Sequence, residues 1–196
     1  MKTPPLHTFT VGQHTVNVYS DPHAENPRTF YDNAGLFLVK GNRHFSGDHD
    51  ASADDVAAIL ANKNNVALPV YAYVHSGVAL ATAPFSCPWD SGMCGVIYIP
   101  WEEAKAEGFK TRKAARVALE AEIQTYSAWL AGDVFGYDIL DPKGECVDSC
   151  WGFYGPGMDY CVEEGTAVAR SHDAALCERQ KSIVDALGAL VGGGEI

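Results

Sequence analysis

The spacing of apolar residues divides the chain into strand-like and helix-like segments. Apolar residues at every second position, or in short unbroken runs, predict strands at 14–19, 35–39, 66–74, 78–82, 95–99, 134–139 and 145–148. The residues at 75–77 and 141–144 have the composition of turns, which predicts that the strands beside them form hairpins. The segment 21–28 contains two prolines and is predicted to be a loop.

Helical spacing predicts one long helix in the middle of the chain, at 112–131. Its apolar residues recur every three or four positions and form one stripe: Leu119, Ile123, Tyr126 and Leu130. Gly132 is expected to end this helix as a C-terminal cap. Glu122 lies at the margin of the stripe, so its side chain is expected to be only partly exposed.

Three further helices are predicted from their first residues or their spacing. Ser52 and Asp55 can form a capping box that opens a helix running to about residue 61. Pro100 ends a strand, and the acids that follow Trp101 suit the first turn of a short helix. The segment 166–191 has apolar residues spaced for one helical face, and Glu163 and Glu164 are expected to belong to its cap region.

These elements predict an α+β fold: an antiparallel sheet of about five to seven strands, with the 112–131 helix and a C-terminal helix packed on it. With 196 residues and 47% hydrophobic content, the chain is long enough for one sizeable core. We expect residues 1–164 to form a single domain and residues 165–196 to form a helix that packs on the same domain.

The chain is acidic, with a formal net charge of −11, and its acids are concentrated. From Val117 to Ala169 there are ten acids and one base, Lys143. Such a surface repels nucleic-acid phosphates, so we expect no direct nucleic-acid binding. The same acidity keeps a protein soluble and can also attract a basic partner surface.

No apolar stretch is long enough to span a membrane, and residues 1–7 lack the apolar core of a secretory signal. We therefore expect the protein in the cytoplasm, with no membrane partner. In that compartment the six cysteines should be mostly reduced thiols.

Two short segments share an unusual composition, a Ser-Cys pair beside a Trp: 85–92 (FSCPWDSG) and 148–155 (DSCWGFYG). Thiols, hydroxyls, carboxylates and aromatic rings on a glycine-rich backbone are typical of a polar pocket. Each segment is predicted to leave the sheet at the end of a hairpin strand, because Pro88 and Gly92 interrupt the first. If the hairpins share one sheet, Cys87 and Cys150 should line one pocket, with His75 and Glu122 as neighbours.

One hypothesis gives these segments a catalytic role. Cys87 or Cys150 would be the nucleophile and His75 its base, with Asp90 or Asp148 orienting the imidazole. A reactive thiolate needs a lowered pKa, and neither cysteine opens a predicted helix that would provide it. The alternative is that both thiols are buried and inert, packed against the tryptophans of their segments.

Metal and cofactor motifs are missing from the sequence. Cys146 and Cys150 would lie roughly 13 Å apart along a strand, too far to share a zinc ion unless the strand bends. The glycines form no phosphate-binding loop, and there is no serine elbow. We expect no metal site and no cofactor.

The order of the motifs resembles a family of small proteins encoded by bacteriophages and plasmids. The motifs that carry the resemblance span about residues 17–155 and include ENPR at 25–28, RHFSGD at 43–48, HSG at 75–77, GDVFGY at 132–137 and the two Ser-Cys segments. The chain departs from the family pattern at Val74, where an acid is expected, and in its long C-terminal helix. The resemblance implies a phage or mobile-element accessory protein and brings no catalytic residues.

Residues from these motifs are expected to line a binding pocket: Arg28, Trp89, Ser91, Glu122, Tyr126, Asp148, Ser149 and Trp151. The leading hypothesis is a binding protein that modulates a host protein, in host takeover or counter-defence. The alternative is a small hydrolase or transferase that uses His75 with Cys87 or Cys150. A structural virion protein is less favoured, because no assembly arm or repeat is present.

Overall fold

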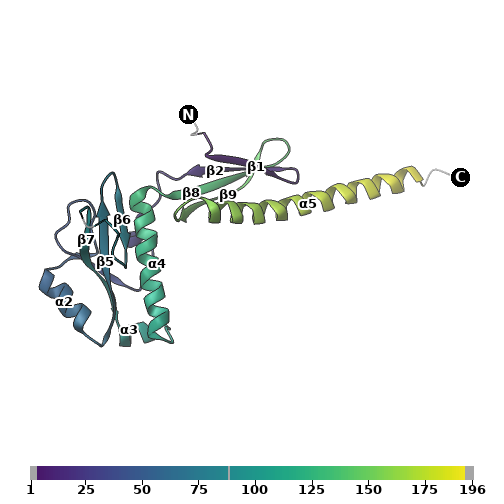
Figure 1. Cartoon of the computed structure of the whole chain (residues 1–196). Coiled ribbons are helices and arrows are strands. Elements are labelled where there is room, and N and C mark those ends of the chain that lie inside the picture. The colour runs from purple at the N-terminus through teal and green to yellow at the C-terminus, as the bar shows by residue number, and fades with distance from the viewer. Residues whose placement is uncertain (1–3, 88, 193–196) are drawn as a thin grey trace. The chain divides into compact units, whose positions relative to one another are not determined.

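The structure is a computed structural model that describes residues 4–87 and 89–192, with side chains described as far as residue 187. It confirms the predicted α+β class, with strands in two sheets and helices packed on them (Figure 1). The chain forms two compact units. The larger contains Pro22–Val134 and Tyr154–Pro156, and the smaller contains the chain up to Asp21, Phe135–Phe153 and the chain from Gly157 on.

The larger unit is built on a five-stranded sheet. In spatial order its strands are β4 (His49–Asp50), β3 (Leu36–Val39), β7 (Ser91–Pro100), β5 (Asn65–Val74) and β6 (Val78–Ala81). Its helices are α1 (Pro27–Phe30), α2 (Ala53–Ala61), α3 (Trp101–Ala106) and α4 (Arg112–Ala131). β3 and β4 run parallel, and the other neighbouring strands run antiparallel.

Helices cover both faces of this sheet. Leu119 and Ile123 of α4 are buried in the core on one face, together with Val70 of β5. Val56 of α2 is buried on the other face, where it joins Val96 of β7. The two-residue period of the strands separates these cores, because successive side chains point to opposite faces.

Local signals set the ends of the main helices, and the capping box of α2 and the Gly132 cap of α4 were predicted. The Ser52 side chain and Asp55 form the capping box of α2. The Thr111 hydroxyl accepts the Ala114 N–H at the start of α4, and Gly132 ends that helix in the left-handed conformation at φ 77°. Glu122 is partly buried, with 15% of its side chain exposed, as its place on the helix predicts.

The smaller unit is a four-stranded sheet covered by one helix. Its strands, in order, are β1 (His7–Val11), β2 (His14–Ser20), β8 (Val134–Leu140) and β9 (Cys146–Tyr154), and the helix is α5 (Asp159–Gly192). Val16 and Ile139 of the sheet share a buried core with Cys161 and Ala169 of α5. The apolar side of α5 therefore stabilises one face of the sheet.

Several predicted boundaries are wrong, each for a local reason. The loop predicted at 21–28 contains the start of α1, because Asn26 caps the helix and Pro27 occupies its first turn, where a missing N–H costs nothing. The strand predicted at 95–99 begins at Ser91, so the last two residues of the 85–92 segment, Ser91 and Gly92, belong to the sheet, while its other described residues connect β6 to β7 as predicted. Pro88, which was also predicted to interrupt this segment, lies outside the described residues.

The second Ser-Cys segment also differs from its prediction. Seven of its residues, Asp148 to Tyr154, continue strand β9 instead of leaving the sheet. Glu163 and Glu164 lie inside α5, which begins at Asp159, so the predicted cap region is wrong. The sequence pattern also missed β1 and β4, which are exposed or only two residues long.

The strands divide between two sheets, so the two predicted hairpins do not share one. The hairpin of β5 and β6 belongs to the five-stranded sheet, and β8 and β9 belong to the four-stranded sheet. The single domain expected over residues 1–164 stays a prediction.

Candidate functional site

The 85–92 segment leads from β6 into β7 in the larger unit. Hydrogen bonds and an aromatic contact with neighbouring residues hold its described residues in place. The Ser91 hydroxyl donates to the Cys87 carbonyl at 2.5 Å, and the Val74 N–H donates to the Asp90 carbonyl at 2.9 Å. The Phe85 ring lies 5.8 Å from the Tyr73 ring, centre to centre. The loop is therefore anchored at both ends.

His75, Cys87 and Asp90, three of the predicted catalytic residues, do come together here. The Asp90 Oδ2 atom lies 3.4 Å from His75 Nδ1 and 3.8 Å from the Cys87 Sγ atom, which donates to it. In a nucleophile–base–carboxylate triad the imidazole stands between the other two groups. Here the carboxylate stands between the thiol and the imidazole, an order that holds the loop together but does not pair the thiol with the imidazole.

Trp89 lies in the same loop with 92% of its surface exposed, the highest value among the exposed large apolar residues of the described chain. A tryptophan so exposed gains nothing for the fold from hydrophobic burial. The interpretation of Cys87 as a thiol buried against this ring is wrong, because Cys87 is only half-buried and Trp89 is in solvent.

Arg28 is the centre of a second group in the larger unit. Its guanidinium pairs with both oxygens of Asp48 and donates from Nη1 to Glu122 Oε2 at 2.7 Å. The same group donates to the Asn33 side chain at 3.0 Å and to the Gly35 carbonyl at 2.7 Å. Only 5% of the Arg28 side chain is exposed. Its donors are therefore used within the fold.

The carboxylates of this group are also saturated. Glu122 Oε1 accepts the N–H of Ala34 at 2.9 Å, and Asp48 Oδ2 accepts the N–H of Phe37 at 2.7 Å. Burial opposes the charged form of Arg28, but hydrogen bonds to Asp48 and Glu122 outweigh it and raise the pKa of the guanidinium above its ordinary value. The network joins α1, β3 and α4, which makes it structural.

Tyr126, which was predicted to line the same pocket as Arg28 and Glu122, lies beside this network. Its hydroxyl also has a hydrogen-bond partner within the fold. Its hydroxyl donates to the Ser46 carbonyl at 2.7 Å, and burial raises the pKa of the phenol. Asp48 is the member of this network that the predicted binding pocket did not include. The RHFSGD motif contained it, but only the folded chain shows that its carboxylate faces Arg28.

Residues 148–153 of the second Ser-Cys segment lie in the smaller unit, on the edge strand β9. Asp148 Oδ2 is 3.0 Å from Nε2 of His172 on α5, and Asp148 Oδ1 accepts the N–H of Ser149 at 2.8 Å. The Trp151 ring stacks on Tyr19 with centres 5.8 Å apart and covers Gly136 so closely that a Cβ there would collide with it. Trp151 is 46% exposed, and Cys150 is exposed, so the buried-thiol interpretation fails here as well.

A cluster that the sequence did not indicate joins α5 to the turn between β1 and β2. His14 is 3% exposed, and its Nδ1 atom lies 3.5 Å from Asp173 Oδ1 without forming a hydrogen bond. The Gln13 N–H donates to the same oxygen at 2.7 Å, and the rings of His14 and His172 are 6.1 Å apart. The only available signal was a histidine on the apolar side of a predicted strand.

The predicted site residues therefore fall into groups in two separate units. The larger unit holds Arg28, His75, Cys87, Trp89, Asp90, Ser91, Glu122 and Tyr126, and the smaller holds Asp148, Ser149, Cys150 and Trp151. That Cys87 and Cys150 line one pocket stays a prediction. Among the described residues no group of three or more His, Cys, Asp or Glu side chains is arranged to hold a metal ion, and no helix is long and apolar enough to cross a membrane.

Two other cysteines have environments that keep them protonated. Burial raises the pKa of Cys94 to about 12 and that of Cys161 to about 11. The Cys94 thiol donates to the Val70 carbonyl at 3.3 Å. Neither is a nucleophile at neutral pH.

Comparisons with protein-family models, with curated proteins and with solved structures find no match to this chain. Its function is therefore argued from the groups described above.

Proposed function

We propose that the protein is a binding protein whose recognition surface is centred on the loop that carries Trp89. The observation that carries this proposal is the 92% exposure of Trp89 on a loop anchored by Asp90 and Ser91. Tryptophan is enriched at the energetic centres of protein interfaces. Burying a large apolar side chain against a partner is worth about 1.5–3 kcal/mol.

The internal bonds of the loop support this role. A loop that is already ordered loses little conformational freedom when it binds, so more of the contact energy appears as affinity. The hydrogen bond that Cys87 donates to Asp90 and the contact of His75 with the same carboxylate supply that order without any catalytic step. The cluster read from the sequence as a catalytic site is then the support of a binding loop.

The partner that we propose is a protein of the bacterial host. The resemblance to phage and plasmid proteins supplies the context, which is an accessory protein acting in the host cytoplasm during host takeover or counter-defence. Beside Trp89, the partly exposed Asp90 carboxylate, with 39% of its side chain accessible, favours a basic residue on the partner. The acidic character of the whole chain would favour the same class of partner surface.

The test is a quantitative pull-down from bacterial lysate with three baits: the wild type, Trp89→Ala and Cys87→Ser. We expect one host protein, recovered in stoichiometric amount by the wild type and by Cys87→Ser and lost with Trp89→Ala. Purified partner and calorimetry would then give the affinities of all three. Undiminished capture of the same protein by Trp89→Ala would refute the proposal.

A second candidate function, a small hydrolase or transferase, is favoured by the convergence of His75, Cys87 and Asp90. It requires the loop to rearrange so that the imidazole faces the thiol. Labelling with an electrophile such as iodoacetamide distinguishes the two. An enzyme of this kind would show fast labelling of Cys87 that His75→Ala slows, whereas a supporting thiol reacts at a rate that His75→Ala leaves unchanged or raises.

A further inference from the structure

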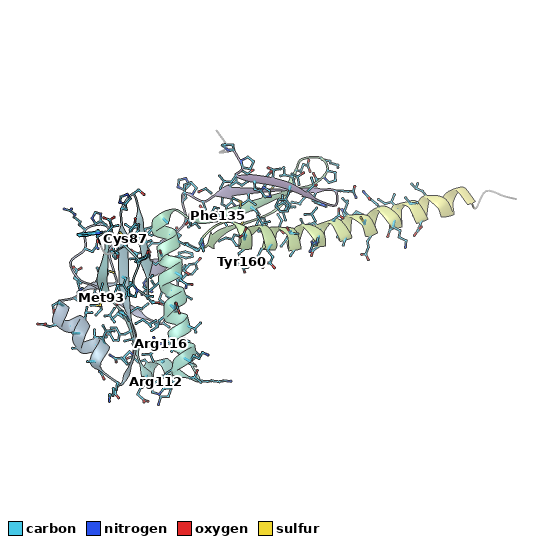
Figure 2. All side chains as sticks on the ribbon, in the orientation of Figure 1. Cys87, Met93, Arg112, Arg116, Phe135 and Tyr160 are labelled. Atoms are coloured by element: carbon cyan, nitrogen blue, oxygen red, sulfur yellow. The ribbon has the colours of Figure 1, made fainter. Side chains whose placement is uncertain are left out.

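A basic hollow lies in the larger unit, where α2 ends and α4 begins. It has a volume of about 230 Å³, and its lining includes the cations Lys63, Arg112 and Arg116. No carboxylate lines it among the described residues, although the chain as a whole carries a net charge of −11. Arg112 and Arg116 lie toward the end of α4 that is far from Cys87 (Figure 2). The hollow is therefore distinct from the Trp89 loop.

The two arginines are held in place by the edge of strand β5. β5 pairs with β6 only from Tyr71 onward, among the strand pairs of the described chain, and this leaves earlier carbonyls of β5 open on that side. Arg112 Nη1 donates to the Asn65 carbonyl at 2.9 Å, and Arg116 Nη1 donates to the Ala67 carbonyl at 3.3 Å. Each guanidinium has five N–H donors, so these bonds use only part of its capacity.

A stacking contact fixes the first of these groups further. The Cζ atom of Arg112 lies 5.0 Å from the centre of the Trp101 ring, within the range of a cation–π interaction. Covering an open strand edge explains why one basic residue stands at each position. It does not explain why three cations share one hollow that contains no acid.

The position of these bases on α4 is electrostatically unfavourable. The first turns of α2 and α3 carry acids, which suit the positive end of a helix dipole. The first turn of α4 carries none, and instead Arg112 and Lys113 open the helix. A chain with many acids that places bases at this end breaks a local rule, and such breaks are expected at functional sites.

We propose that this hollow binds the phosphate group of a small phosphorylated molecule. Guanidinium groups match phosphate oxygens with paired hydrogen bonds, and the lysine adds a point charge. The volume is below the roughly 300–1,000 Å³ of sites that hold drug-sized ligands, which suits a phosphate or pyrophosphate group. The rest of such a ligand would remain outside the hollow.

The helix dipole of α2 opposes the binding of an anion here, but its partial charge is smaller than the charge of the three cations. The last residues of α2 belong to the lining of the hollow, and the C-terminal end of a helix is equivalent to about half a negative charge. The Asn62 N–H already covers the carbonyls of Ala58 and Ile59, and the Asn65 side chain donates to Ile59 at 3.3 Å. Three full positive charges outweigh the remainder.

The experiment is calorimetric titration of the full chain with inorganic pyrophosphate, AMP and a single-stranded oligonucleotide, at constant ionic strength. We expect the wild type to bind pyrophosphate and AMP with dissociation constants below about 10 mM. Arg112→Gln/Arg116→Gln should weaken this binding by roughly tenfold or more, since each loses charged hydrogen bonds. The matched control is Lys110→Gln/Lys113→Gln, which removes the same charge from exposed residues outside the hollow.

If the double arginine variant does not fold, Lys63→Gln takes its place in the test. It leaves both strand-edge bonds intact and should weaken binding several-fold. The proposal is overturned if the wild type binds neither small phosphate, or if the lysine control weakens binding as much as the arginine variant. Binding to the oligonucleotide that strengthens with its length, with no binding of AMP, would also overturn it in favour of a nucleic-acid surface.

Discussion

Arg28 and Glu122 form an ion pair at 2.7 Å between residues that stand 94 positions apart in the chain. The side chains are 5% and 15% exposed, and each has further hydrogen-bond partners. The pair ties α1 to the middle of α4. Both residues were predicted to line a binding pocket, and the structure gives them a role in holding the larger unit together.

Removing one side of this pair should be costly. Glu122→Ala leaves the buried guanidinium without one carboxylate and the N–H groups of Ala34 and Gly35 without acceptors, so we expect a loss of about 3–5 kcal/mol in the free energy of unfolding. Urea denaturation followed by tryptophan fluorescence measures it. Glu120→Ala, exposed on the same helix, is the control and should cost less than about 1 kcal/mol. Equal losses in the two variants would contradict a structural role for the network.

The fit of Trp151 over Gly136 predicts a coupling between these residues. Gly136→Ala places a Cβ against the indole ring and should destabilise the smaller unit by about 1–3 kcal/mol. In a Trp151→Ala background the same change should cost much less, because the ring that it strikes is gone. The four variants of this double-mutant cycle are compared by urea denaturation.

Gly92→Ala is the matched control for that cycle. Gly92 also lies in a strand, and a Cβ there would meet nothing within 4 Å. Its cost should therefore be small in both backgrounds. An additive cycle for Gly136 and Trp151 would mean that the ring does not pack on the glycine.

The buried thiol of Cys94 predicts a stability that falls at high pH. Burial raises the pKa of Cys94 to about 12 in the folded chain, whereas an unfolded thiol ionises near pH 8.5–9. Its contribution is complete below about pH 8, and the free energy of unfolding then falls by up to about 1.4 kcal/mol per pH unit until the folded thiol ionises. The measurement is urea denaturation between pH 8 and 11 for the wild type and Cys94→Ala.

The informative quantity is how steeply the free energy of unfolding falls with pH in each of the two proteins. Cys94→Ala removes a buried thiol that donates to the Val70 carbonyl, so it lowers stability below about pH 8, where the thiol is protonated in both states. Its loss of stability per pH unit should nevertheless be smaller than in the wild type. Parallel curves for the two proteins would show that Cys94 ionises as easily in the folded state as in the unfolded state.

Local signals account for the parts of the fold that the sequence predicted well. The boundaries of α4 follow from the Thr111 cap and Gly132, and those of α2 follow from Ser52 and Asp55. β1 was missed because its residues are mostly exposed and carry no buried alternation. β9 was placed too short because it is an edge strand with polar residues on both sides, which looks like a loop in the sequence.

The candidate sites were less predictable, because they depend on contacts far apart in the chain. That His75 lies near Asp90 follows from the hairpin and loop that separate them, and this grouping was predicted. That Asp90, and not His75, stands between the other two groups depends on side-chain directions that no spacing reveals. The partnership of His14 with Asp173 joins the two ends of the chain, and no local pattern could indicate it.

Asp173 is predicted to hold α5 on the sheet of the smaller unit. Asp173→Ala leaves the Gln13 N–H without its acceptor and His14 without its neighbouring carboxylate, so we expect a loss of about 1–3 kcal/mol. Hydrogen exchange should become faster in α5 and in the turn between β1 and β2, and remain unchanged in the larger unit. Asp185→Ala, exposed farther along α5, is the control that should leave exchange rates in that turn unaltered.

The two tryptophans of the Ser-Cys segments should separate binding from stability. Trp89 is in solvent, so Trp89→Ala should change the free energy of unfolding by less than about 0.5 kcal/mol while abolishing partner capture. Trp151 packs on Tyr19 and Gly136, so Trp151→Ala should cost about 1–3 kcal/mol. Paired denaturation and pull-down measurements on the two variants decide this. A stability loss in Trp89→Ala as large as that in Trp151→Ala would mean that the exposed ring serves the fold, and the binding proposal would lose its central observation.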